Sequence, residues 1–129
     1  MFRHAAAGHP MLREVAVASA GVAAIDGNRA TSLACTAVRA AFGLDLSAHR
    51  ARKLLPGTEA DLVLALDAES LDAARRLRLD VRLALLGDYA GTGEEVPDPY
   101  GGDRSEYDAC AHQIERLVQA VVERLAASR

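Results

Sequence analysis

The two cysteines are the first residues to test for chemistry, because a thiol can act as a nucleophile, a metal ligand or half of a disulfide. Cys35 and Cys110 lie far apart in the sequence, each in an apolar and helix-like context. This arrangement matches neither a disulfide framework nor a zinc site. We therefore predict two buried free thiols and no metal.

A second group that could do chemistry is the run Asp98-Pro99-Tyr100, which lies in the long polar stretch 87–102. A carboxyl group can transfer a proton, and an exposed tyrosine ring can stack on an aromatic ligand. Asp-Pro is also a common way to start a turn. The residue types alone leave both readings open.

Composition bounds the protein that holds these residues. The chain has 129 residues, the size of one domain with one core, and we expect a single domain over 1–129. Half of the residues are hydrophobic, only 4% are aromatic and Trp is absent, which predicts an aliphatic core and excludes disorder. The net charge is −3, with basic and acidic residues interspersed, so no basic stripe indicates a nucleic acid partner.

Targeting signals are also missing from the printed residues. No apolar run reaches the roughly 18 to 20 residues of a membrane span, and the first residues are not followed by a secretory apolar region. We expect a cytoplasmic protein that makes no membrane contact.

Three short apolar runs predict strands, at residues 15–19, 61–66 and 81–86. The latter two are nearly continuous, which is typical of parallel strands covered on both faces. Helical spacing predicts three helices. The first covers 30–42 and ends at Gly43, and the second begins after Asp67 as its N-cap. The third runs from a capping box at Asp103 and Glu106 to the C-terminus. Alternating strands and helices favour a parallel sheet with right-handed crossovers, whose ligands bind beyond the carboxyl ends of the strands.

Four stretches, taken in order, resemble the low-molecular-weight protein tyrosine phosphatase family: Ser19–Gly21, Leu44–Arg52, Ala60–Asp67 and Val96–Gly101. Phe2-Arg3-His4 is similar to the middle of that family's first helix, so the resemblance covers essentially the whole chain. It implies an α/β fold with three αβα layers and a short parallel sheet. In the family a central first strand and a C-x5-R phosphate loop precede that helix, and we expect both to be absent from this chain.

The resemblance implies hydrolysis of a phosphomonoester through a covalent phosphocysteine, without a cofactor. A thiolate attacks phosphorus, backbone amides and an arginine hold the phosphoryl oxygens, and an aspartic acid protonates the leaving phenolate. Asp98 matches this general acid, and the substrate would be a phosphotyrosine protein or a small aryl phosphate. Tyr100 matches the aromatic residue of the substrate slot; a loop tyrosine packed on the sheet edge is the alternative.

Three further residues match positions around the family's phosphate loop. Ser19 and His49 match residues that brace it, although a strand-end hydroxyl and a surface histidine explain them equally well. Asp67 matches a carboxylate behind the site, but a helix N-cap explains it fully, and we prefer the cap.

Cys110 and Arg116 have five residues between them, which is the spacing of the phosphate loop. On an α-helix, residues six apart lie about 600° apart and therefore on different faces, and mid-helix amides are already hydrogen-bonded. The segment has no glycine and carries Glu115. Cys35 has Arg39 at the wrong spacing. We expect neither cysteine to be the nucleophile.

The absent strand would leave two apolar strands facing a gap, which favours aggregation. Either the protein starts upstream of Met1, or the remaining strands close together, or a partner such as a second copy covers the edge. We expect the first. For function, we expect a phosphatase-like domain that is inactive as this chain. The alternatives are a non-catalytic binding module and an arsenate reductase relative, although Cys35 and Cys110 suit a thiol relay poorly.

Overall fold

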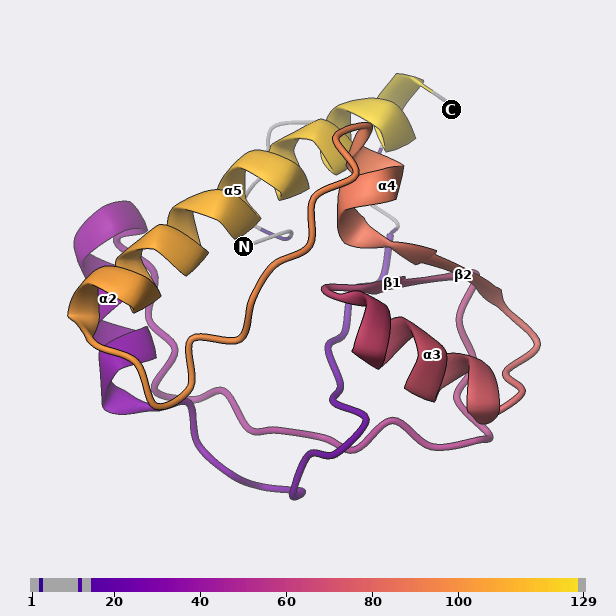
Figure 1. The fold of residues 1–129 in the computed structure, drawn as a ribbon, viewed down its shortest axis with the longest axis horizontal. Coiled ribbons are helices and arrows are strands. Elements are labelled where there is room, and N and C mark those ends of the chain that lie inside the picture. The colour runs from indigo at the N-terminus through magenta and orange to yellow at the C-terminus, as the bar shows by residue number, and fades with distance from the viewer. Residues whose placement is uncertain (1–2, 4–11, 13–14, 128–129) are drawn as a thin grey trace.

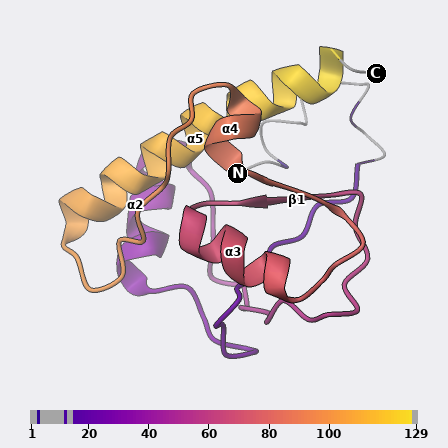
Figure 2. The same cartoon turned by 45° about the vertical axis from the view of Figure 1, so that its right-hand side comes forward.

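A computed structural model describes Arg3, Leu12 and residues 15–127. A sheet of two strands, β1 (Leu62–Ala65) and β2 (Arg82–Leu85), forms the middle layer (Figure 1). Helix α3 (Ala68–Arg76) lies on one side of the sheet, and α4 (Leu86–Ala90) and α5 (Arg104–Ala127) lie on the other. The turned view in Figure 2 shows the same three layers. This is the predicted α/β fold with a short parallel sheet.

The sheet is a single parallel β-α-β unit. Leu62 pairs with Arg82 and Ala65 with Leu85, and α3 makes the crossover between the two strands. Helix α3 begins where the side chain of Asp67 accepts a hydrogen bond from the amide of Ser70 at 2.7 Å, as the sequence predicts. It ends at Leu77, after which Arg78 takes a left-handed conformation with φ 54°.

Helix α5 supplies more buried hydrophobic residues than any other element of the described chain, because one of its faces is apolar. Its buried residues are Tyr107, Ala111, Leu117, Val118, Val121 and Val122. Leu117 and Val121 pack with Leu86, Tyr89 and Val96, which come from α4 and the loop after it. Asp103 caps α5 by accepting from the amide of Glu106 at 3.0 Å, as predicted. The core therefore forms mainly between α5 and the layer beneath it.

Helix α2 (Ser32–Phe42) packs against α5 at the end of the molecule away from α4 (Figure 1). The side chain of Thr31 caps its start by accepting from the amide of Ala34 at 3.2 Å. Gly43 ends it with φ 67°, a conformation that glycine adopts without steric cost, which confirms the predicted helix end. The ring of Phe42 meets His112 edge-on with centroids 5.3 Å apart, which joins the two helices.

Two local predictions are wrong. Residues 15–19 form no strand, because a strand requires a neighbour that completes its hydrogen bonds and no ladder pairs this run within the described part of the chain. Helix α4 lies where the sequence indicates only a polar loop. Its second residue, Gly87, is buried, and a Cβ there would lie 1.8 Å from the carbonyl oxygen of Glu94. Glycine is thus present for close backbone approach, which the sequence pattern does not distinguish from a turn.

Both outer edges of the sheet are unpaired among the described residues, since β1 and β2 pair only with each other. Accordingly Leu62, Val63 and Leu64 are only half-buried, and Leu66, just after the strand, is 41% exposed. Among the helices of residues 15–127, none combines the length and apolar character that a membrane crossing needs.

Candidate active site

The segment that carries Asp98, residues 94–102, crosses the carboxyl end of β1. The amide of Val96 donates to the carbonyl of Leu66 at 2.8 Å, and the Val96 side chain is 2% exposed in the core. The carboxylate of Glu95 accepts from the amide of Ala68 at 2.6 Å, so it joins the start of α3. We call residues 94–102 the Asp98 segment. Its backbone is tied to the sheet edge at which ligands bind in open α/β folds.

Asp98 itself is exposed, and its orientation is fixed by its own turn. Its Oδ1 accepts from the amide of Tyr100 at 3.0 Å, an Asx-type turn. The amide of Gly102 donates to the carbonyl of Pro99 at 2.8 Å, which closes the next turn over Gly101. Tyr100 is 80% exposed, so it is not packed on the sheet edge. The carboxyl group of Asp98 and the ring of Tyr100, two residues later, are therefore both exposed to solvent.

The start of the Asp98 segment is held by α5. Arg116 donates two hydrogen bonds to the carboxylate of Glu94, at 2.6 and 2.7 Å. Gln113 donates to the same carboxylate at 3.3 Å and to the carbonyl of Glu95 at 3.0 Å. The hydrogen bonds from Arg116, with smaller contributions from Thr92 and Gln113, lower the pKa of Glu94 to about 2. The pair is therefore fully charged at neutral pH.

The sequence does not predict this contact: it does not single out Glu94 or Gln113, and it points to Arg116 only through its spacing from Cys110. Glu94 and Arg116 are separated by a loop and half a helix, and no local pattern links them. The available signal was weak: Gln113 and Arg116 are three residues apart, which places two polar side chains on one face of α5.

Asp67 lies at the carboxyl end of β1, and its side chain is used as the N-cap of α3. Asp67 therefore lies at the predicted sheet edge, and it acts as the helix N-cap that we preferred on the sequence. A role for Asp67 behind a phosphate site stays a prediction.

Ser19 and His49 are both exposed. The chain brings their neighbourhoods together, because Gly21 donates to the carbonyl of Arg52 at 2.8 Å and accepts from the amide of Leu54 at 3.0 Å. Farther along the same two stretches, Ala51 donates to the carbonyl of Asn28 at 2.8 Å. In the described part of the chain no hydrogen bond or ion pair joins either side chain to Asp98. Their bracing roles stay predictions.

The two cysteines are free thiols, as predicted, but they are half-buried. Burial raises the pKa of the Cys110 thiol, and the negative charge of the nearby Asp98 carboxylate raises it further. A raised pKa keeps the thiol protonated, which is the opposite of what a nucleophilic cysteine needs. Arg116, at the suggestive spacing, is bound to Glu94. Among the described residues, no three His, Cys, Asp or Glu side chains are grouped to hold a metal ion.

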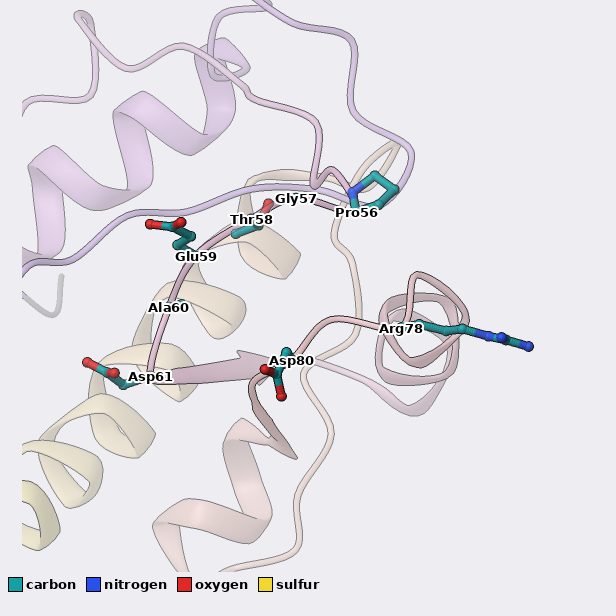
Figure 3. Close-up of a pocket in the computed structure, with 8 residues that line it drawn as sticks. All are labelled: Pro56, Gly57, Thr58, Glu59, Ala60, Asp61, Arg78 and Asp80. Carbon is teal, nitrogen blue, oxygen red and sulfur yellow. The ribbon is translucent and has the colours of Figure 1, made fainter.

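A hollow of about 630 Å³ lies at the opposite end of the sheet, before the amino ends of β1 and β2 (Figure 3). It is lined by Pro56, Gly57, Thr58, Glu59, Ala60, Asp61, Arg78 and Asp80. Nearly all of these residues are exposed, and Figure 3 shows Arg78 pointing away from the others. Three carboxylates and no inward cation give this hollow the wrong charge for a phosphate.

Comparison with known proteins agrees with this fold. Residues 1–129 match the family model described as low molecular weight phosphotyrosine protein phosphatase. A low molecular weight protein-tyrosine-phosphatase of Streptomyces coelicolor is 39% identical over 84 residues, which cover 57% of this chain and 49% of the relative. The chain thus spans about half the length of that curated relative.

Two solved structures extend the comparison. A tyrosine phosphatase of Erwinia amylovora is 25% identical with a TM-score of 0.81, covering 95% of this chain and 82% of that one. An arginine phosphatase of Geobacillus stearothermophilus is 26% identical with a TM-score of 0.79, covering 98% and 84%.

Proposed function

This chain belongs to the low molecular weight phosphotyrosine protein phosphatase family, and from that premise we propose that it provides the acid half of a phosphomonoester hydrolase. Asp98 is the proton donor to the leaving oxygen. The observation that carries this proposal is the position of Asp98, which is exposed in an ordered turn just beyond the carboxyl end of β1. In such folds this edge is where a ligand meets side chains from several strands.

The chemical step follows the family's covalent route. A cysteine thiolate forms a bond to phosphorus while the bond from phosphorus to the substrate oxygen breaks. The protonated Asp98 carboxyl gives its proton to that oxygen, so the leaving group departs as a neutral phenol. The resulting Asp98 carboxylate can then accept a proton from the water that releases phosphate. General acid catalysis of this kind is worth about 10² to 10⁴ in rate.

The substrate we propose is a phosphotyrosine protein or a small aryl phosphate. Tyr100 supports this choice, because its exposed ring directly follows the Asp98-Pro99 pair and can stack on a phenyl ring. The Streptomyces coelicolor and Erwinia amylovora relatives are tyrosine phosphatases, while the Geobacillus stearothermophilus relative is an arginine phosphatase. A comparison of aryl phosphate with phosphoarginine therefore belongs in the test.

The nucleophile must come from outside Cys35 and Cys110. Both thiols are half-buried in helices, and the pKa of Cys110 is raised by burial and by Asp98. We therefore propose that these 129 residues alone do not turn over and that turnover requires a C-x5-R loop joined to them. In that assembly Ser19 and His49 would brace the loop, and Asp67 would lie behind it.

A non-catalytic binding module is the competing proposal, and the open edge of β1 is the observation that favours it. In that case a second copy covers the half-buried strand and Leu66, and the isolated chain sediments as a dimer. Arsenate reduction is the weaker alternative, because it needs accessible relay cysteines. A cytoplasmic location stays a prediction from the sequence.

The test begins with the endogenous protein, isolated from its source and characterised by intact mass and by hydrolysis of an aryl phosphate. Asp98→Asn introduced at the chromosomal copy should lower kcat by about 10² to 10⁴. Asp80→Asn, an exposed carboxylate at the opposite end of the sheet, is the matched control and should leave kcat unchanged. An endogenous protein without hydrolysis would favour the binding module. Hydrolysis by the purified 129-residue chain that is lost in Cys110→Ser or Cys35→Ser would refute our assignment of the nucleophile.

A further inference from the structure

Three successive residues at the start of the Asp98 segment are held by three different elements. Glu94 is held by Arg116 of α5, Glu95 by the first amide of α3, and Val96 by the first carbonyl after β1. Only Glu95, Val96 and Pro97 separate Glu94 from Asp98. Pro97 adds a fixed φ to this short connection. A displacement of Glu94 should therefore also displace Asp98, because the connection between them is short and partly rigid.

The contact between Glu94 and α5 has the geometry of a specific recognition site. Arg116 binds both carboxylate oxygens, which fixes direction as well as distance. Gln113, one helical turn earlier, bridges the Glu94 carboxylate and the Glu95 carbonyl with one amide nitrogen. The two side chains thus hold the side chain and the backbone of the same segment. An isolated exposed ion pair would hold only one of these.

We propose that Arg116 and Gln113 form a clasp on Glu94 and Glu95 that positions Asp98 relative to α5. Arg116 and Gln113 are positioning residues, since they act on the proton donor through the backbone of the Asp98 segment. The functional meaning of this clasp rests on the proposed role of Asp98 as general acid. Its geometric content is independent of catalysis and can be measured on this chain.

Cys110 provides the measurement, because it lies on the same helix as Arg116 and senses Asp98. The Asp98 carboxylate is close enough to raise the pKa of the Cys110 thiol beyond the effect of burial. If the clasp holds Asp98 near α5, then opening the clasp must weaken this effect. The thiol therefore reports the separation between the Asp98 segment and the helix.

The experiment titrates Cys110 by thiolate absorbance in a Cys35→Ser background, with folding checked by circular dichroism. Asp98→Asn should lower the Cys110 pKa, and Arg116→Gln should lower it as well. Loss of a positive charge at Arg116 would by itself raise that pKa, so a decrease indicates movement of Asp98. Adding Arg116→Gln to Asp98→Asn should lower the pKa no further, and Arg116→Lys should recover part of the effect.

Arg104→Gln is the matched control, because it breaks another ion pair of α5, the one to Asp108, without touching the Asp98 segment. If Arg116→Gln leaves the Cys110 pKa at the control value, or shifts it equally with and without Asp98, the clasp does not position Asp98. The same holds if Asp98→Asn has no effect on the thiol. Should Arg116→Gln not fold, Gln113→Ala makes the same comparison. Failure of the proposed function would instead appear as unchanged hydrolysis in Asp98→Asn, with the titration result intact.

Discussion

Residues 94–102 and residues 15–20 both carry predicted site residues, Asp98 and Tyr100 in the first and Ser19 in the second. The first segment is tied to β1, to α3 and to α5 by contacts at three successive residues. The second has no ladder beside it within the described chain, and Ser19 is exposed. The first segment is therefore tied to the sheet and to two helices through its backbone and side chains. The second has no strand partner among the described residues and is held by packing of Val15 on Val118 and Val122 and by a hydrogen bond from Arg3 to the carbonyl of Val17. Site residues are ordered by the elements that contact them, whatever motif they belong to.

The largest effect on stability is expected from a substitution that separates Gly87 of α4 from Glu94. In Gly87→Ala the new Cβ would meet the carbonyl oxygen of Glu94, a backbone atom that cannot rotate away. We expect unfolding to become easier by about 1 to 3 kcal/mol or more, as for overpacked cores, measured by urea unfolding. Gly57→Ala is the control, because its Cβ would have nothing within 4 Å. Equal stabilities of the two variants would contradict the close approach.

A smaller effect is expected at the end of β1. Asp67→Ala removes the hydrogen bond from the amide of Ser70 and should cost about 1 kcal/mol, the usual value of an N-cap. Asp67→Ser keeps a capping oxygen and should recover most of that loss. Should Asp67→Ser be as unstable as Asp67→Ala, the carboxylate itself would matter, which would favour the predicted role behind the site over the cap.

The clasp predicts a change in the pH dependence of stability. The folded pKa of Glu94, about 2, lies below its ordinary value of 4.5, so the carboxylate contributes stability that is complete above pH 4.5 and is lost as the pH falls toward 2. In Glu94→Gln this part of the acid destabilisation should disappear, and high salt should reduce the difference because the pair is exposed. Glu123→Gln, an exposed change on α5, should leave the acid limb unchanged.

The smallest effect belongs to the other segment. Ser19→Ala should change the free energy of unfolding of this chain by less than about 0.5 kcal/mol, as for exposed positions away from caps and cores. A larger loss in urea unfolding would show that the Ser19 side chain is already held in place. That result would remove the contrast between the two segments.

The sequence was sufficient where the determinants of structure are local. Helix caps at Asp67, Asp103 and Gly43 depend on one residue and its near neighbours, and all three were predicted. The apolar stripe of α5 and the continuous apolar runs of β1 and β2 likewise predicted one helix and two strands. Asp98 was singled out by the family resemblance, and its place near the carboxyl end of β1 agrees with the rule that ligands bind at this edge of a parallel sheet.

The sequence failed where the determinants are contacts between distant residues. The run 15–19 has strand character, but pairing depends on a neighbouring strand that its own residues cannot report. Helix α4 depends on close packing of Gly87 against Glu94, and the clasp depends on Arg116 meeting a loop that precedes α5. Each of these is a tertiary contact without a periodic signature.

The closure of the 87–94 loop also bears on how this chain can change in length. The carbonyl of Gly87 accepts from the amides of Thr92 and Gly93 at 2.9 and 3.0 Å, so both ends of the loop meet at one point. Gly91 and Gly93 are exposed and take left-handed conformations in this closure, with φ of 89° and 72°. Thr92 lies between these glycines, and its hydroxyl also accepts from the amide of Glu94 at 3.2 Å, so residues inserted here would break the hydrogen bonds that close the loop. A change of length between Gly91 and Gly93 should therefore displace Glu94, and with it Asp98, whereas the same insertion at an exposed position such as Gly57 should not.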